Sequence, residues 1–105
     1  MAGRPQGVRT FVNETEVDQA VKSATGKLYG ISLSWNTKSV GDRIIISDST
    51  DGTGTPTKLF EFVLPTTAGS FSPHLPSVGL EAALGIWLNF QAAGGGEINV
   101  NVDYD

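Results

Sequence analysis

The residue best suited to chemistry in this 105-residue chain is its single histidine, His74, because imidazole can act as an acid, a base or a metal ligand near neutral pH. It stands between Pro73 and Leu75, and the chain contains no cysteine. Nucleophilic catalysis needs a base, held by an orienting group, beside an activated nucleophile. His74 has no such setting, so we expect a loop residue, and we predict a protein that is not an enzyme and has no catalytic residue, metal or cofactor.

A second candidate is the stretch DSTDGTGTPT, which runs from Asp48 to Thr57 and has some of the composition of a calcium-binding loop. An EF-hand loop needs oxygen ligands at alternate positions and a bidentate glutamate at its twelfth position. Counted from Asp48, the third position is Thr50 and the twelfth is Leu59, which cannot bind calcium. The composition therefore predicts a solvated loop with its tightest turn at Asp51–Gly52.

The stretch EINVNVDY near the C-terminus alternates strictly between apolar and polar residues, which predicts a strand. Its polar row could bind a cation or a sugar, but such a row is more often the hydrated face of an antiparallel strand. We therefore expect a hydrated face. The row consists of Glu97, Asn99, Asn101 and Asp103.

Trp87 lies in a predicted strand, GIWLNFQ, whose Ile86, Leu88 and Phe90 would point inward, so that Trp87 would lie on the outer face. A large aromatic side chain there must be covered by something. A loop, the N-terminal segment or a second subunit could cover it, and a sugar-stacking platform is a further possibility. By the same alternation, Trp35 is predicted to lie in the core.

The elements that would position these residues are short strands separated by turns. The chain has 13 glycines and five prolines, and its 105 residues suffice for one core without disulfides. Residues 28–47, LYGISLSWNTKSVGDRIIIS, predict a two-stranded hairpin around which the other strands are arranged, with Tyr29 on its apolar face. Residues 58–64 and 85–91 predict further strands, and residues 78–83 are either a strand or a turn. The expected fold is a single antiparallel β-sandwich, jelly-roll-like, with about seven or eight strands.

The N-terminal part of the chain is less regular. Residues 1–13 are predicted to form an extended arm, in which residues 8–12 could be a short strand, and residues 14–105 the sandwich domain. Residues 13–23 are a short helix candidate, although an irregular connection fits nearly as well.

The overall charge and hydropathy exclude several classes of partner. With a formal net charge of -4 and only 17% charged residues, the chain lacks the basic surface that nucleic-acid binding needs. No apolar stretch is long enough to span a bilayer, and the N-terminus lacks the apolar run of a secretory signal. We therefore expect neither nucleic acid nor a membrane as a partner.

Five stretches of the chain carry a family resemblance: LYGISLSW, GDRIIISDST, FEFVLPTTAGSFSPHLPSVG, LGIWLNF and INVNVDY. In these strand patterns and glycine turns, residues 26–104 resemble small proteins from the head-gene regions of tailed bacteriophages. Those proteins look like jelly-roll or β-sandwich capsid decoration (cement) proteins.

The resemblance implies a virion protein that is made in the host cytoplasm and binds the outer surface of the capsid. Cement proteins tie neighbouring subunits together where capsomers meet, often as trimers. The implied partners are therefore the major capsid protein of the same phage and other copies of this chain, with a homotrimer favoured. An extended arm can become ordered on its neighbour when it docks. The implied contact residues are Arg4, Val8, Arg9, Phe11 and Val12 in the arm and Trp87 in the sandwich.

Two other classes of function remain. A tail, fibre or vertex accessory protein that binds a receptor or a carbohydrate would need a concave polar site with exposed aromatic residues. Trp87, with the row of Asn99 and Asn101, is the only hint of one. A small jelly-roll metal enzyme would need several histidine and carboxylate ligands, and the chain has one histidine.

Overall fold

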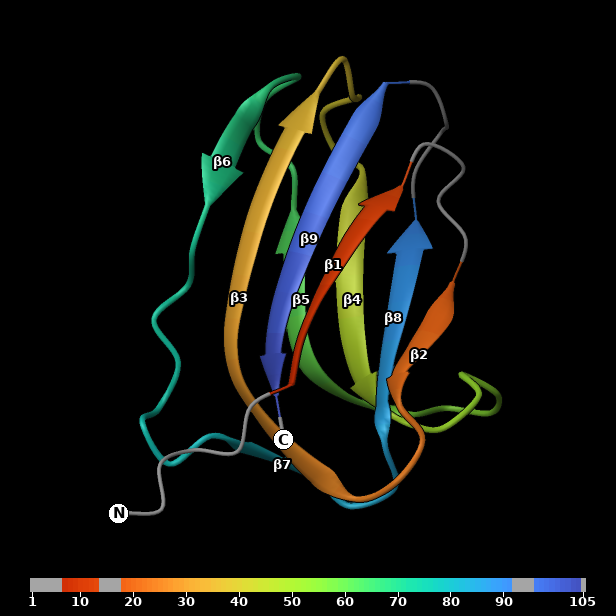
Figure 1. Ribbon diagram of the computed structural model, residues 1–105. Helices are drawn as coiled ribbons and strands as arrows, with labels where there is room; N and C mark the ends of the chain where they lie inside the picture. Colours follow the sequence, from red (N-terminus) through yellow and green to blue (C-terminus); the bar gives the residue numbers. More distant parts are fainter. Residues whose placement is uncertain (1–6, 14–17, 92–95, 105) are drawn as a thin grey trace.

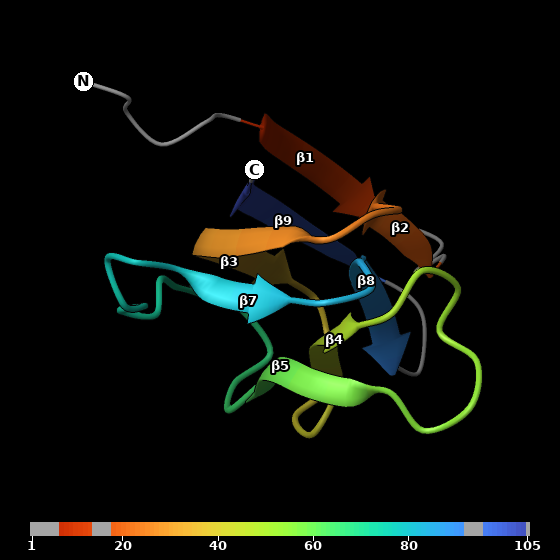
Figure 2. The same ribbon diagram turned by 90° about the horizontal axis from the view of Figure 1, so that it is seen from below.

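Two antiparallel sheets lie face to face and form a β-sandwich in the computed structural model (Figure 1), which describes residues 7–13, 18–91 and 96–104. Sheet A has the strand order β1-β9-β3-β6, with β7 also paired to β3, and sheet B has the order β2-β8-β4-β5. Seen from below, the two sheets form the two layers of the molecule (Figure 2). The strands are β1 (Gly7–Asn13), β2 (Gln19–Lys22), β3 (Gly26–Asn36), β4 (Arg43–Asp48), β5 (Thr57–Val63), β6 (Gly69–Phe71), β7 (Leu80–Ala82), β8 (Ile86–Gln91) and β9 (Glu97–Tyr104).

The order of the strands is that of a jelly roll. β6 pairs with β3 near Trp35 and β7 pairs with β3 near Gly26, so these two short strands together fill one strand position of sheet A. Each sheet then has four positions, and the chain passes repeatedly from one sheet to the other, as in the double-sheet jelly roll. The predicted all-β, jelly-roll-like sandwich is confirmed.

The predicted hairpin of residues 28–47 is wrong. β3 belongs to sheet A, where it pairs with β9, β6 and β7, whereas β4 belongs to sheet B, where it pairs with β5 and β8. Residues 37–42 therefore cross from one sheet to the other. Each strand has one apolar face that packs against the common core, and alternation alone does not distinguish strands that face each other across a sandwich from strands that pair.

Tyr29 does not share the buried face of β3, as its spacing from Ile31 predicted. The register of β3 against β9 shifts between Leu28 and Gly30, which is the signature of a β-bulge at Tyr29. The extra residue reverses the alternation, so that Leu28 is fully buried and Tyr29 lies close to Gly79 in the connection before β7. Beyond the bulge, Ile31, Leu33 and Trp35 are buried as predicted.

The core lies between the sheets and is almost entirely aliphatic. It is filled by alternate residues of β3, β4, β8 and β9, together with Val21, Leu64 and Ala82 from shorter elements. Trp35 is buried in it, as predicted, and its Nε1 donates a hydrogen bond to the carbonyl oxygen of Thr66 at 3.0 Å.

The connection between β3 and β4 contains a buried ion pair that the sequence did not reveal. The side chain of Lys38 is inaccessible to solvent, and its Nζ lies 4.0 Å from Oδ2 of Asp42. The same oxygen accepts a hydrogen bond from the backbone N–H of Ser39 at 3.1 Å. The buried pair therefore holds the chain where it passes between the sheets.

The other predicted elements can be placed as follows. Residues 19–22 form strand β2, so the helix candidate over 13–23 is wrong for these four residues, while residues 14–17 lie outside the described part of the chain. The predicted strands at 8–12, 58–64, 85–91 and 97–104 correspond to β1, β5, β8 and β9. Nothing in the described ranges forms a helix that is long and apolar enough to cross a membrane.

Candidate functional site

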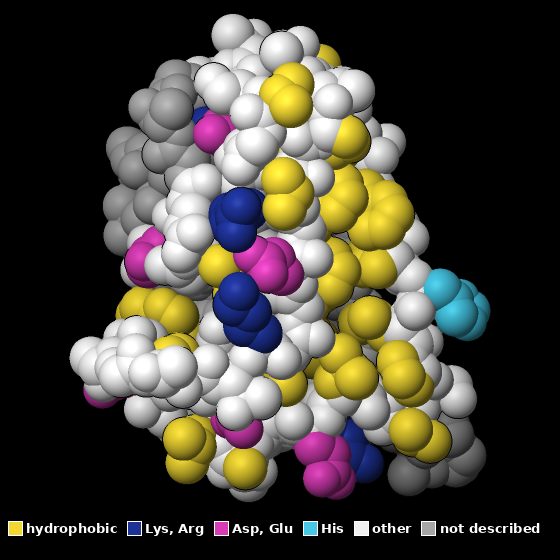
Figure 3. Space-filling model, turned by 180° about the vertical axis from the view of Figure 1, so that it is seen from behind, with side chains coloured by type: hydrophobic (Ala, Val, Ile, Leu, Met, Phe, Trp, Pro, Cys, Tyr) yellow, Lys and Arg dark blue, Asp and Glu magenta, His cyan; other side chains and the backbone are white. Residues whose placement is uncertain are grey.

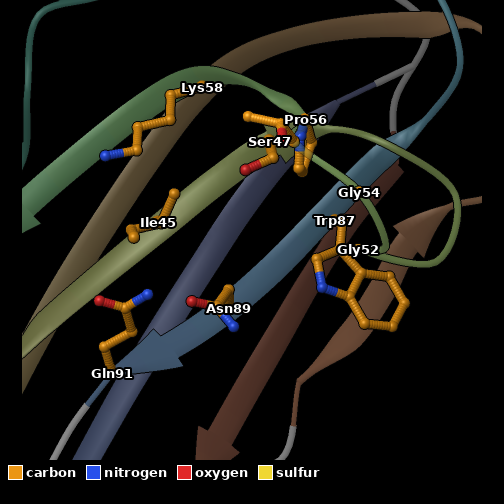
Figure 4. Close-up of a pocket in the computed structure, with 10 residues that line it drawn as sticks. Ile45, Ser47, Gly52, Gly54, Pro56, Lys58, Trp87, Asn89 and Gln91 are labelled. Carbon is orange, nitrogen blue, oxygen red and sulfur yellow. The ribbon is translucent and has the colours of Figure 1, made fainter.

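A pocket lies on the outer face of sheet B, where the connection between β4 and β5 folds over β8 (Figure 4). Its volume is about 270 Å³, close to the lower end of the range for small-molecule sites. It is lined by Ile45, Ser47, Gly52, Gly54, Thr55, Pro56, Lys58, Trp87, Asn89 and Gln91. The lining therefore combines an apolar floor and an indole with hydroxyl, amide and ammonium groups.

Trp87 is half-buried, and the connection between β4 and β5 supplies its cover. A Cβ atom on Gly52 would lie 2.4 Å from Nε1 of Trp87, so only a glycine lets the loop approach the indole this closely. Gly52 also has a φ of 74°, in the left-handed region that glycine tolerates. Of the coverings considered for Trp87, a loop is the one observed among the described residues.

The loop that covers Trp87 is held by its own side chains. Ser49 Oγ accepts hydrogen bonds from the backbone N–H groups of Asp51 and Gly52, at 3.2 and 2.7 Å. Asp51 Oδ1 accepts hydrogen bonds from the N–H and the hydroxyl of Thr53, at 2.9 and 2.8 Å, and these bonds lower the pKa of Asp51. The predicted turn at Asp51–Gly52 is confirmed, and the Asp51 carboxylate is engaged within it. Within the described residues, no group of three or more His, Cys, Asp or Glu side chains could hold a metal ion.

The floor of the pocket is made by two residues of β4 that face away from the core. Ile45 is 6% exposed and Ser47 is 4% exposed, although both lie on the outer face of sheet B. The alternation of β4 predicts their direction, but their burial depends on how the connection of residues 49–56 folds back over the strand.

Charged groups at the rim of the pocket are paired with one another. Glu61 accepts hydrogen bonds from Lys58 Nζ and from Arg43 Nη1, both at 3.0 Å. The hydrogen bond from Lys58 and the positive charges of both partners lower the pKa of Glu61. On the other side, Asp18 Oδ1 accepts a hydrogen bond from the N–H of Phe90 at 2.9 Å, and Asp18 Oδ2 accepts one from the side-chain amide of Asn89.

A second feature is an aromatic cluster of Trp35, Phe62 and Phe71, at the edge where β5 and β6 bring the two sheets together. The rings of Phe62 and Phe71 are stacked, with centroids 4.5 Å apart and an interplanar angle of 8°. Trp35 packs against Phe62 from the core side, with ring centroids 5.6 Å apart. Phe71 is nevertheless 39% exposed. Figure 3 shows hydrophobic side chains gathered beside a short row of basic and acidic ones on this side of the molecule.

The predicted contact residues lie on different elements where the structure describes them. Arg4 lies outside the described residues, and Val8, Arg9, Phe11 and Val12 belong to β1, whose backbone pairs with β9 in sheet A and whose side chains are not described. Trp87 belongs to sheet B.

The other candidate residues lie away from the pocket. His74 is exposed in the connection between β6 and β7, as predicted. The polar row of β9 lies on sheet A, where Asn99 Nδ2 donates hydrogen bonds to Glu97 Oε1 at 3.3 Å and to Ser34 Oγ at 3.4 Å. Asn99 and Asn101 are therefore not neighbours of Trp87, and the groups that do surround the indole are Ser47, Asn89 and Gln91.

Comparison with known proteins identifies no relative: no protein-family model, no curated protein and no solved structure matches this chain.

Proposed function

We propose that this protein is a non-enzymatic structural component of a tailed-bacteriophage virion, which binds the outside of the head and stabilises the shell by contact. Two lines support the proposal: the resemblance of residues 26–104 to head-gene proteins, and the jelly roll itself, a fold used by viral capsid domains as well as by lectins and cupins. Because the fold alone serves several functions, the proposal needs a surface feature as well.

The observation that carries the proposal is the exposed aromatic cluster at the β5/β6 edge. Aromatic residues are enriched at protein interfaces, where a few well-packed side chains supply most of the binding energy. Phe71 is 39% exposed although its ring is already held in place by stacking on Phe62, so it presents a rigid apolar surface to a partner. A rigid side chain loses little conformational entropy when it is buried in an interface.

The partners in this proposal are the major capsid protein and other copies of the chain, with a trimer favoured. We propose that the aromatic cluster, rather than Trp87, makes the main apolar contact, because the β4–β5 connection already covers part of the Trp87 indole. Residues 1–13 would add contacts to a neighbouring capsid subunit.

The first experiment is to count the copies of this chain in purified native particles by quantitative mass spectrometry against the major capsid protein. We expect near parity between the two, because a shell cement occupies every equivalent junction. A handful of copies per particle would instead indicate a vertex, neck or tail accessory protein, and absence from the particle would refute a virion role.

A variant tests the contact surface. The variant is added to particles that lack the wild-type protein, and its bound copies are counted. Phe71→Ser should bind at least about tenfold more weakly than the wild-type protein, the loss expected when an interface loses an aromatic anchor. Leu84→Ser is the matched control, because Leu84 is 62% exposed and its turn is bonded to Asp48, at the opposite end of β4 from the residue that pairs with Phe62. Equal occupancy for both variants, with unchanged thermal unfolding, would exclude the aromatic cluster as the contact.

A further inference from the structure

We propose that the pocket beside Trp87 binds a neutral saccharide ring. The strongest single observation is the Ser47 side chain, which lines the pocket and is only 4% exposed. Its hydroxyl forms no hydrogen bond with any other residue that the structure describes. Buried polar groups are nearly always hydrogen-bonded, so an unpaired hydroxyl aimed into a pocket points to a bound partner.

Two further polar groups face the same pocket, and neither has a hydrogen-bond partner among the residues that the structure describes. The indole N–H of Trp87 and the side-chain amide of Gln91 make no hydrogen bond to other described residues. Figure 4 shows the nitrogen-bearing edge of the indole on the pocket side, with the six-membered ring turned away from it. The pocket therefore offers the indole donor, the hydroxyl, which can donate or accept, and the amide, which can do both.

The apolar part of the lining suits the C–H groups on the faces of a sugar ring. A pyranose ring presents C–H groups on its faces and hydroxyl groups around its rim, so a matching site needs an apolar surface bordered by hydrogen-bonding groups. Ile45 and Pro56 supply aliphatic surface, and the indole borders it with its nitrogen-bearing edge (Figure 4). The size agrees as well, since about 270 Å³ lies near the lower end of the range for small-molecule sites.

The charges around the pocket favour a ligand without net charge. Lys58, the only cation among the described lining residues, pairs with Glu61 at 3.0 Å, and Arg43 pairs with the same carboxylate. Asp18 is engaged by Asn89 and by the backbone of Phe90. An anionic or cationic ligand would have to compete with these pairs, whereas a neutral sugar would leave them in place.

The test is a titration of the full-length protein with glucose, galactose and N-acetylglucosamine, followed by ¹⁵N–¹H nuclear magnetic resonance. The chain has two tryptophans, so two indole N–H signals are expected. Trp35 donates its N–H to Thr66 inside the fold and serves as an internal reference. We expect the Trp87 signal and the Ser47 amide to shift with at least one neutral sugar, with a Kd of about 1 mM for so small a ligand.

Two serine variants provide a matched pair. Ser47→Ala should weaken sugar binding about three- to tenfold, the effect of one hydrogen bond, without lowering thermal stability, because the hydroxyl has no partner among the described residues. Ser32→Ala should change nothing, since Ser32 lines a shallow hollow on the outer face of sheet A. Gln91→Ala, at an exposed position, should weaken binding by a similar factor without affecting folding.

Several results would overturn the proposal. These are the absence of any Trp87 shift with all three sugars, shifts that cluster around Ser32 instead, or tighter binding of glucuronic acid or glucosamine than of their neutral counterparts. The outcome is independent of the proposed role on the phage head, because the sugar titration uses the isolated protein and the copy number is measured on particles.

Discussion

At the scale of single residues, the clearest constraint is the carboxylate of Asp48 at the end of β4. It accepts hydrogen bonds from three successive backbone N–H groups, those of Ala83 at 3.0 Å, Leu84 at 2.7 Å and Gly85 at 3.3 Å. Asp48 thereby holds the turn between β7 and β8 against the end of β4. Partial desolvation alone would raise the pKa of Asp48, but the three N–H donors outweigh it and lower the pKa.

This arrangement predicts a pH-dependent contribution to stability. A carboxyl group whose pKa is lower in the folded state stabilises the fold above its unfolded pKa of about 3.9, and the contribution is lost as the pH falls through the folded value. Asp48→Asn should therefore lower the free energy of unfolding at pH 7 by about 1–2 kcal/mol, because hydrogen bonds to an ionised acceptor are stronger than neutral ones.

Chemical denaturation of both proteins between pH 7 and pH 2 would measure the effect. The difference between wild type and Asp48→Asn should vanish at the acid end of the range. Glu81→Gln is the control, because Glu81 is exposed on the neighbouring strand β7 and should show no such difference. A difference that persists at the acid end would mean that the carboxylate charge is not its source.

The sequence predicted single residues well where alternation alone decides their direction. Trp35 is buried and Trp87 lies on the outer face, as expected. It did not reveal the burial of Ser47 or of Lys38, because the burial of a polar side chain depends on how the chain folds over it. The stacking of Phe71 on Phe62 was not predictable either, since it depends on the approach of the two sheet edges.

At the scale of elements, the connection between β4 and β5 decides whether the Trp87 pocket exists. Gly52 and Gly54 both have φ values in the left-handed region, 74° and 73°. They differ in their surroundings, because a Cβ on Gly52 would clash with the indole of Trp87, while a Cβ on Gly54 would meet nothing within 4 Å. A substitution at Gly54 therefore introduces backbone strain alone, whereas a substitution at Gly52 introduces backbone strain and a clash with the indole.

Alanine at the two positions should have different effects. Gly54→Ala should cost about 1 kcal/mol, the strain of a left-handed residue with a side chain. Gly52→Ala should cost at least about 1 kcal/mol more, because overpacking must displace the loop or the indole. Equilibrium denaturation measures both costs, and tryptophan fluorescence should change only in Gly52→Ala. Equal costs and identical spectra would show that the loop does not depend on its contact with Trp87.

The strands themselves were largely predictable, whereas their partners were not. The strict alternation of β8 and β9 identified both strands from sequence. The bulge at Tyr29 depends on the pairing of β3 with β9, and the crossing at residues 37–42 depends on the assignment of β3 and β4 to different sheets. No local pattern encodes either of these.

At the scale of the whole molecule, β1 joins the N-terminal segment to the sandwich. Residues 7–13 pair with β9 along their full length, and β9 lies between β1 and β3. The backbone of these residues therefore forms the outer strand of sheet A. The expectation that they dock on a neighbouring capsid subunit remains a prediction.

Two deletions separate the contribution of the N-terminal residues to capsid binding from the contribution of β1 to the stability of the sandwich. Removing residues 1–6, which precede β1, should leave the thermal unfolding temperature unchanged and weaken binding to the capsid. Removing residues 1–13 should also lower the unfolding temperature, because it strips one side of β9 of its hydrogen-bonded partner and leaves an open sheet edge. If the protein without residues 1–13 has the unfolding temperature of the wild type, β1 contributes little to the stability of the sandwich. If the protein without residues 1–6 binds particles as the wild type does, those six residues have no part in attachment.

The central position of β9 has a consequence for how the protein is made. β9 is the last strand in chain order, yet β1 and β3 reach each other in sheet A only through it. As the chain emerges from the ribosome, the edges of β1 and β3 that pair with β9 stay unpaired until β9 has left the exit tunnel. Distant pairings of this kind form slowly and leave the nascent chain open to association with its neighbours. The jelly roll can therefore close only after β9 has been synthesised.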